Sequence, residues 1–346
     1  MVQTSHKIYF KNSQNMKEVE DESVDLTLTS PPYPLIEMWD QQFAQLNPEI
    51  KNLLVEGKGR RTFERMHQEL DKTWNEIFRV LKDGGIACIN IGDTTRKMGG
   101  QFQQFSNHAR VLGYCTNQLD FSMLPSILWR KQSNKPNKFM GSGMLPSNAY
   151  VTLEHENILI LRKGSNRIFN ADGKKRRYQS AYFWEERNTW FSDIWFDLKG
   201  IDQKLIDNNV RIRSAAFPFE LAYRLVNMYS IQGDIVLDPF LGIGTTLLAA
   251  MASNRNSIGY EIERGFKEVI HKRLQHITSF ANKYLRDRLE KHREFVKKME
   301  GKGKPLKYYS EKYDFKVVTS QETEIFLPFL KEINSIADGK YEIVYE

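Results

Sequence analysis

Apolar residues along this chain alternate between short runs and stretches in which they recur at every third or fourth position. Short runs rich in apolar and β-branched residues at 7–10, 24–28 and 86–91 predict strands, whereas the spacing of three and four over 63–81 predicts a helix. Two consecutive prolines follow the second run and end that strand, because proline cannot donate to a sheet ladder. The alternation of strand, helix and strand favours a mostly parallel sheet with helical crossovers.

The same alternation returns in the C-terminal half of the chain. The pattern predicts a helix over 219–229, a strand over 235–238, a helix over 245–253 and a strand over 257–260. From residue 266 onward, apolar residues mark one face of a long helix. Residues between the two halves are less regular and locally basic, and the tail follows neither pattern. Together the two halves predict an α/β protein with flanking helices.

The composition narrows the class of protein. Hydrophobic residues make up 40% and charged residues 27% of the 346 positions, which is typical of a folded globular chain. The sequence has no run of about 18 apolar residues and no secretory signal, so we expect a cytoplasmic, soluble protein without a membrane partner. Cys88 and Cys115, the two cysteines, predict neither a disulfide framework nor a zinc site, and we expect no metal. The net charge of +7 is compatible with a polyanionic partner but does not demand one.

A glycine-containing loop follows the strand at 235–238 and leads into the next helix. Gly242 and Gly244 allow the backbone to approach a ligand closely, and Thr245 and Thr246 begin the helix, where free N–H groups can hold a carboxylate. Glu261 ends the following strand, where a carboxylate can accept both hydroxyls of a ribose.

The same loop excludes the common phosphate-binding motifs. Leu247 replaces the third glycine of the dinucleotide fingerprint, and no P-loop motif occurs in the chain. The loop therefore favours a nucleoside that carries a carboxylate and no phosphate, and S-adenosylmethionine is such a molecule. The alternative is a purely structural turn between a strand and a helix.

The segment Ser30-Pro31-Pro32-Tyr33 also follows a strand and belongs on the same sheet edge. Its prolines fix the backbone and remove two N–H donors, which leaves the Ser30 hydroxyl and the carbonyls of Ser30 and Pro31 as acceptors. The exocyclic amine of a nucleobase is a poor nucleophile because its lone pair is delocalised into the ring. Two acceptors on its N–H bonds would oppose that delocalisation, and Tyr33 could stack on a flipped base. The alternative is a rigid turn with Tyr33 in the core.

Taken together, the two segments resemble the motifs of the amino-methylating DNA methyltransferases. This family carries S/D/N-P-P-Y/F as its catalytic motif and D-x-F-x-G-x-G as its cofactor motif, and the chain reads Ser30-Pro31-Pro32-Tyr33 and 238–244 in these places. The catalytic motif comes first, which resembles the permuted β-type order, and the resemblance extends over residues 7 to about 275. It implies a Rossmann-like methyltransferase fold with circularly permuted motifs and with S-adenosyl-L-methionine as cofactor.

The resemblance also implies roles for individual residues. Catalysis falls to Ser30, Pro31, Pro32 and Tyr33, which hold the target base and its amine. Cofactor binding falls to Asn12, Phe217, Pro218, Asp238, Phe240, Gly242, Gly244, Thr245, Thr246 and Glu261. Asn12 departs from the family, in which an acidic residue is usual at this position.

The target implied by the resemblance is the N4 amine of cytosine, since serine in the first motif position is associated mostly with that base. N6-adenine methylation, an RNA substrate and a catalytically silent nucleic-acid-binding protein remain as alternatives. Methylation of cytosine C5 is disfavoured, because it needs a cysteine nucleophile after a proline. Cys88 follows Ala87 and Cys115 follows Tyr114, in patterns typical of core positions.

The resemblance implies four regions and a double-stranded DNA partner. They are a catalytic half (1–130), an inserted target-recognition region (131–213), a cofactor-binding half (214–282) and a C-terminal extension (283–346). We expect phosphate contacts from basic residues in the recognition region, namely Lys131, Lys135, Lys174, Lys175, Arg176 and Arg177. A second insertion at 34–62 is expected to close over the flipped base. The enzyme would serve a prokaryotic restriction–modification system whose endonuclease is a separate chain.

Overall fold

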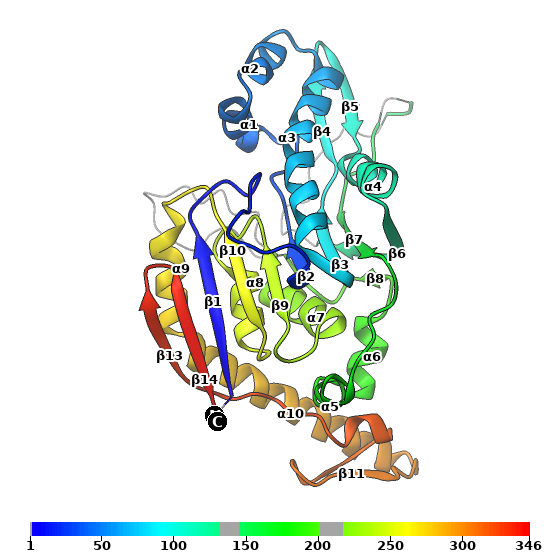
Figure 1. Ribbon diagram of the computed structural model, residues 1–346. Coiled ribbons are helices and arrows are strands. Elements are labelled where there is room, and N and C mark those ends of the chain that lie inside the picture. Colours follow the sequence, from blue (N-terminus) through cyan, green and yellow to red (C-terminus); the bar gives the residue numbers. More distant parts are fainter. Residues whose placement is uncertain (1, 132–144, 148, 201–216) are drawn as a thin grey trace.

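A ten-stranded sheet forms the centre of the part of the chain that the structure describes (Figure 1). The structure is a computed structural model and describes residues 2–131, 145–147, 149–200 and 217–346. The strand order is β13-β14-β1-β10-β9-β2-β3-β7-β6-β8. These strands are β1 (Gln3–Tyr9), β2 (Val24–Thr29), β3 (Leu81–Ile91), β6 (Phe121–Arg130), β7 (His155–Lys163), β8 (Ile194–Trp195), β9 (Ile235–Asp238), β10 (Asn256–Tyr260), β13 (Leu330–Ala337) and β14 (Lys340–Tyr345).

The middle of this sheet is parallel and has antiparallel pairs on both sides, while β8 at one edge runs parallel to β6. Strands β1, β10, β9, β2 and β3 run parallel to one another, while β14 beside β1 and β7 beside β3 run antiparallel. The pairing of β2 with β9 places Leu26 opposite Val236, so the two α/β halves of the chain share one sheet. This arrangement confirms the predicted α/β class with a mostly parallel sheet and flanking helices.

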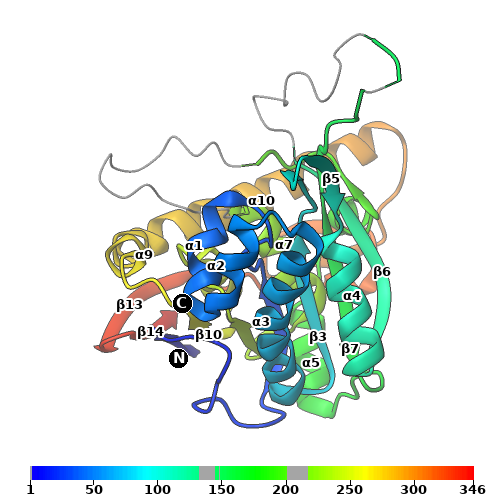
Figure 2. The same cartoon turned by 90° about the horizontal axis from the view of Figure 1, so that it is seen from above.

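Helices cover both faces of the sheet (Figures 1 and 2). Side chains of α3 and α4 pack with Ala87, Ile89 and Leu237 in one core cluster, and side chains of α7 and α8 pack with Leu26 and Cys88 in the other. Successive strand residues therefore alternate between two cores. The helices are α1 (Asp40–Leu46), α2 (Pro48–Val55), α3 (Gly59–Val80), α4 (Asn107–Gln118), α5 (Ala171–Gln179), α6 (Trp184–Trp190), α7 (Phe219–Tyr229), α8 (Thr245–Met251), α9 (Phe266–Gln275) and α10 (Ile277–Gly301).

Smaller elements lie outside the main sheet. The hairpins pair β4 (Thr94–Met98) with β5 (Gln101–Phe105) and β11 (Tyr308–Ser310) with β12 (Phe315–Val317). The 3-10 turns are η1 (Glu37–Trp39) and η2 (Ser320–Glu322). No helix in the described part of the chain is long and apolar enough to span a membrane.

Both cysteines lie in the core, as their sequence patterns predict. Cys88 and Cys115 are buried and free, and burial raises the pKa of both thiols. A thiol with a raised pKa is a weak nucleophile at neutral pH. Among the described residues, no three His, Cys, Asp or Glu side chains are grouped so that they could hold a metal ion.

The C-terminal part of the chain, expected as an extension beyond a boundary at residue 282, contributes β13 and β14 to the main sheet. Helix α10 runs through that boundary, and β14 pairs with β1 so that Val344 lies opposite Gln3. Asn282 exchanges two hydrogen bonds of 2.8 Å with the backbone of Leu330 at the start of β13. The expected recognition region likewise supplies β7 and β8 to the sheet.

Helix α10 is joined to α6 by a buried ion pair. Arg288 is 7% exposed, and its Nη2 lies 2.7 Å from Oε2 of Glu186 while its Nη1 donates to the Tyr223 hydroxyl at 2.9 Å. We expect Arg288→Ala to lower the free energy of unfolding by about 3 to 5 kcal/mol, because it leaves Glu186 without its partner. Urea denaturation measures this change. In the exposed control Arg293→Ala, loss of the 3.6 Å pair with Glu290 should cost less than about 1 kcal/mol.

Candidate active site

The two candidate motifs leave the sheet side by side, because they follow the neighbouring strands β2 and β9. Thr29, at the end of β2, donates a 2.6 Å hydrogen bond from Oγ1 to Oδ1 of Asp238, at the end of β9. The Thr246 hydroxyl reaches back to the Leu28 carbonyl at 3.4 Å. In an open α/β sheet the carboxyl ends of the strands form the ligand-binding edge. The placement expected from the sequence is therefore observed.

Both motifs open into one cavity of about 610 Å³. Its wall contains most of the residues expected at the catalytic and cofactor sites, namely Asn12, Ser30, Pro31, Pro32, Phe217, Asp238, Phe240, Gly242, Thr245 and Glu261. Tyr33, Pro218, Gly244 and Thr246 are not part of the wall. The cavity has the size of a small-molecule site and brings an acceptor-rich corner next to a glycine loop.

The glycine loop is shaped by two residues in the left-handed region. Gly242 has φ of 54° and Gly244 has φ of 80°, values that side-chain-bearing residues rarely adopt. A Cβ placed on Gly242 would have only the Phe240 carbonyl oxygen within reach, at 4.0 Å, so this position faces open space. The backbone can thus come close to a ligand in the cavity, as the sequence predicts.

Glu261 stands at the end of β10, opposite this loop. It is 8% exposed, and its two oxygens accept hydrogen bonds of 2.7 Å from the backbone N–H groups of Gly242 and Glu263. Burial raises the pKa of Glu261 to about 7. The carboxyl is therefore held in one orientation in the cavity wall, with an ionisation that changes near neutral pH.

Asp238 lies at the base of the same loop and is 3% exposed. It accepts hydrogen bonds from Thr29 and from the backbone N–H of Phe240, and burial raises its pKa to about 6. Arg273 of α9 supports the other side of the loop, since its Nη1 donates to the Ile243 carbonyl at 2.6 Å. The hydrogen bonds of Phe240 to Asp238 and of Arg273 to Ile243 therefore tie the glycine loop to the end of β9 and to α9.

The catalytic segment places its serine and its tyrosine in different surroundings. Ser30 is half-buried and lines the cavity. Tyr33 is 4% exposed, and its hydroxyl bonds to Ser30, Asn90 and Glu156, so the structure places the ring in the core. Stacking of Tyr33 on a base stays a prediction.

Sequence reasoning missed several residues around the site. Asn90 on β3 and Glu156 on β7 contact the catalytic segment, yet both lie far from it along the chain. The segment expected to close over a base forms η1, α1 and α2, which lie above the sheet edge (Figures 1 and 2). Trp39 of η1 and Gln42 of α1 line the cavity, where an apolar ring and an amide face the two motifs.

The candidate DNA-binding residues do not gather at the site. Lys131 pairs with Glu156 at 3.0 Å beside the catalytic segment, and Lys135 lies outside the described residues. Lys174, Lys175, Arg176 and Arg177 are in α5, at the opposite end of the sheet (Figure 1). Arg176 donates to the Gln232 carbonyl in the turn before β9, which lies at the amino ends of the parallel strands. Charge density in the sequence does not tell which edge of the sheet such a helix occupies, and phosphate contacts from this run stay a prediction.

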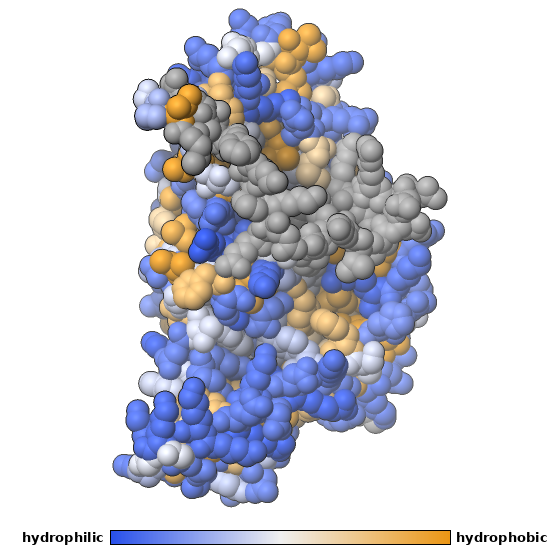
Figure 3. Space-filling model, turned by 180° about the vertical axis from the view of Figure 1, so that it is seen from behind, coloured by the Kyte–Doolittle hydropathy of each residue, from blue (hydrophilic) through white to orange (hydrophobic). Residues whose placement is uncertain are grey.

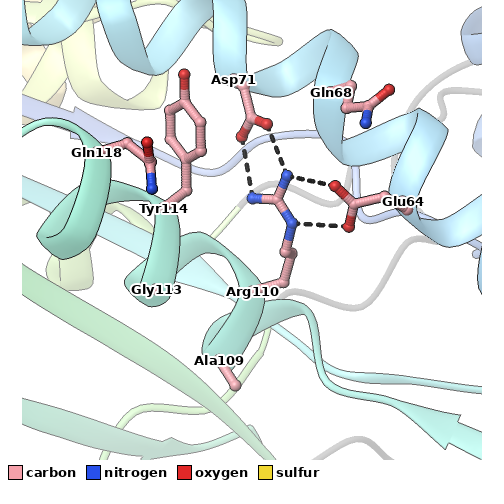
Figure 4. A pocket seen from close by; sticks show the side chains of 8 residues that line it. All are labelled: Glu64, Gln68, Asp71, Ala109, Arg110, Gly113, Tyr114 and Gln118. Atoms are coloured by element: carbon pink, nitrogen blue, oxygen red, sulfur yellow. Dashed lines mark hydrogen bonds and ion pairs between the residues drawn. The ribbon is translucent and has the colours of Figure 1, made fainter.

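Two other surface regions carry no candidate chemistry. From behind, the end of the molecule that holds the C-terminal part of α10 is mostly hydrophilic (Figure 3). A hollow of about 460 Å³ lies between α3 and α4, where Arg110 bonds to Glu64 and Asp71 at 2.7 to 3.2 Å (Figure 4). Both carboxylates hold the guanidinium, so this cluster joins α4 to α3 away from the two motifs.

Comparison with known proteins places the chain in a family. The protein-family model described as DNA methylase matches residues 24–272. The Type II methyltransferase M.MthZI of Methanothermobacter thermautotrophicus is 51% identical over 100% of this chain and 96% of its own length. The Type II methyltransferase M.MjaI of Methanocaldococcus jannaschii is 49% identical over 79% of this chain and 92% of its own.

Solved structures agree with the fold. The DNA modification methylase TTHA0409 of Thermus thermophilus, in complex with S-adenosyl-L-methionine, is 30% identical with a TM-score of 0.60, over 78% of this chain and 94% of that one. PvuII DNA methyltransferase (cytosine-N4-specific) is 17% identical with a TM-score of 0.53, over 82% and 93%, and shows the fold alone. The Rossmann-like methyltransferase fold is thereby confirmed. The chain belongs to the DNA methylase family that its two motifs resemble, the N4/N6 amino-methyltransferases.

Proposed function

We propose that this DNA methyltransferase transfers a methyl group from S-adenosyl-L-methionine to the exocyclic N4 amine of a flipped cytosine in double-stranded DNA. It would act at a specific site, as the modification enzyme of a restriction–modification system. One observation carries the proposal: the Ser30-Pro31 acceptor corner, the glycine loop at Gly242 and the Glu261 carboxylate open into the same cavity. That arrangement suits an amine and a methyl donor that must meet.

The cofactor expected from the sequence, S-adenosyl-L-methionine, is confirmed by the family and by the complex of the Thermus protein. Residues in the cavity fit it: the Glu261 carboxylate suits the ribose hydroxyls, and Thr245 with the N-terminus of α8 suits the carboxylate tail. When bound, this cofactor supplies an electrophilic methyl group on a sulfonium.

The chain's own residues then act on the amine. Ser30 Oγ and the Pro31 carbonyl accept hydrogen bonds from the two N–H bonds, which keeps the nitrogen lone pair out of the base ring. Transfer would be one direct displacement: the amine nitrogen would bond to the methyl carbon, the carbon–sulfur bond would break with its electron pair staying on sulfur, and the nitrogen would release a proton to solvent water. Positioning of the reactants and a preorganised polar site account for most of the rate enhancement.

Cofactor affinity should depend on pH through Glu261. Because its pKa is raised to about 7 and only the carboxylate accepts from both hydroxyls, the affinity should be high above that pH and fall below it. Well below the pKa, the dissociation constant should rise about tenfold per pH unit. Calorimetric titration across this range measures the change.

The control is Glu261→Gln, which should bind more weakly at high pH and lose this dependence. Wild-type affinity that does not change with pH would contradict the assignment of the ribose site. Asp238, whose pKa is raised to about 6, stays in both proteins, so the comparison isolates Glu261.

The choice of cytosine rests on the serine in the first motif position. N6-adenine methylation uses the same acceptor corner and is the alternative within this class. A silent nucleic-acid-binding protein is disfavoured, because such a protein has no need of Ser30 in the cavity wall or of a glycine at 242.

Expression in a bacterial host whose DNA lacks N4-methylcytosine tests this proposal. Sequencing of that DNA by a method that detects modified bases should show N4-methylcytosine at one short recurrent sequence. N6-methyladenine instead would overturn the choice of base but keep the mechanism. An unmodified genome, despite folded protein with bound cofactor, would contradict a double-stranded DNA substrate.

A further inference from the structure

A buried polar network lies directly behind the catalytic segment. The Tyr33 hydroxyl donates to Oε2 of Glu156 at 3.0 Å, and it receives a hydrogen bond from Nδ2 of Asn90, also at 3.0 Å. Asn90 Nδ2 donates to the same carboxylate oxygen at 2.7 Å, and Lys131 pairs with the other oxygen at 3.0 Å. Tyr33 is 4%, Glu156 8% and Asn90 0% exposed, so the contacts among these three residues are shielded from water, while Lys131 is partly exposed.

The network determines which way each proton points. A carboxylate only accepts hydrogen bonds, so the single proton of the Tyr33 hydroxyl is committed to Glu156. The phenol oxygen has two lone pairs, and Asn90 occupies one of them. Ser30 Oγ lies 3.0 Å from the same oxygen and must therefore be the donor in that contact.

This direction leaves the serine oxygen ready to accept. Its own proton points back at Tyr33, and its lone pairs remain for a group in the cavity that Ser30 lines. Burial, and then the nearby charge of Glu156, raise the pKa of Tyr33 well above its usual value, so the phenol keeps the proton that it donates.

We propose that Glu156 is a positioning residue that acts through the Tyr33 hydroxyl to fix Ser30 as a hydrogen-bond acceptor for the target amine. The inference rests on the proposed function and deepens it. A free serine hydroxyl rotates and can donate as well as accept, and a donor aimed at the amine nitrogen would occupy the lone pair that must attack. Four separate segments, which contain Tyr33, Asn90, Lys131 and Glu156, meet to prevent that rotation.

Two substitutions test this relay, which runs from Glu156 through the Tyr33 hydroxyl to Ser30. Tyr33→Phe removes the acceptor of the Ser30 proton and should lower kcat about tenfold. Glu156→Gln lets an amide donate to Tyr33 and should lower kcat about 10- to 100-fold, because a charged hydrogen bond is lost. The cofactor dissociation constant in both variants, and the KM for DNA in Tyr33→Phe, should stay within about twofold of the wild type, since neither residue lines the cavity.

The double variant separates a relay from two independent effects. If both residues act through Ser30, Tyr33→Phe with Glu156→Gln should be no slower than the slower single variant. The matched control is Glu154→Gln, an exposed carboxylate paired with Arg130, which should keep the wild-type rate. Thermal unfolding of each variant shows that it is folded, and Tyr33→Phe tests the relay by itself if Glu156→Gln fails to fold.

The outcomes distinguish this inference from the proposed function. Wild-type turnover in both single variants, or independent effects that multiply in the double variant, would overturn the relay even if Ser30→Ala is inactive. If Ser30→Ala also keeps full turnover, the amine-orienting role itself is wrong. The relay is supported if kcat falls in Tyr33→Phe and Glu156→Gln but not in Glu154→Gln, and if the double variant is no slower than the slower single variant.

Discussion

Ser30→Ala is expected to lower kcat for methyl transfer by about 100- to 1000-fold, the cost of removing one preorganised polar group from a reacting centre. The substitution removes the side-chain acceptor and leaves only the Pro31 carbonyl on the amine. Ser30 contacts Tyr33 and makes no hydrogen bond to the glycine loop or Glu261 in the described residues, so cofactor affinity should stay within about twofold of the wild type. Single-turnover transfer of labelled methyl groups, with calorimetry of cofactor binding, measures both quantities.

Ser279→Ala is a suitable control for this change. Ser279 is exposed on α10, and its hydroxyl donates to the carbonyl of His276, the residue before that helix. The control should methylate DNA at the wild-type rate. Full turnover in Ser30→Ala would refute the role given to the acceptor corner, and a parallel loss of cofactor binding would show that Ser30 belongs to the cofactor site instead.

Gly242→Trp is expected to abolish measurable cofactor binding, with at least about a 100-fold rise in the dissociation constant. Its Cβ would face the open cavity, so the indole would occupy the space between the loop and Glu261. The φ of 54° adds backbone strain of about 1 to 2 kcal/mol for any residue with a Cβ. Calorimetry with S-adenosyl-L-methionine measures the loss, and thermal unfolding shows that the protein remains folded.

Gly303→Trp is a control in which a residue with a side chain also has to adopt a left-handed backbone conformation. Gly303 has φ of 69° and nothing within 4 Å of an added Cβ, and it lies after α10. Its substitution should leave cofactor affinity unchanged. Normal affinity in Gly242→Trp would mean that the cofactor does not use this loop.

Local patterns predicted the central elements well. The strands expected over 235–238 and 24–28 appear as β9 and as β2, which is one residue longer. The expected helix over 63–81 begins four residues earlier and ends at Val80, since Leu81 already has extended backbone at the start of β3. These elements carry strong periodicity, and their own side chains decide their structure.

The first residues of β1 were not predicted as a strand, because they are polar. Only its last residues were expected as a strand, because the first ones are Gln3, Thr4, Ser5 and His6. His6 is fully buried, and its ring bonds to Ser257 and Thr4, while Thr4 also bonds to Tyr345 of β14. Those partners come from distant strands, so no local pattern reveals that a polar strand is buried.

At the candidate site too, local segments could be predicted from the sequence and contacts with distant strands could not. The two motifs could be found because each is a compact segment with its own backbone requirement, prolines in one and glycines in the other. Glu156 and Asn90 could not be predicted as site residues, because they reach the site only when β3 and β7 lie beside the catalytic segment. The edge at which the basic run in α5 lies could not be predicted for the same reason: its position depends on contacts with the turn before β9.

One measurement tests the central claim most directly. The purified protein is incubated with labelled S-adenosyl-L-methionine and diverse unmethylated double-stranded DNA, and the digested nucleosides are identified by mass spectrometry. The account predicts label in N4-methylcytosine, and label in N6-methyladenine would preserve transfer to an exocyclic amine while changing the base. Cofactor binding without any methylated nucleoside, or label at carbon 5 of cytosine, would contradict the account.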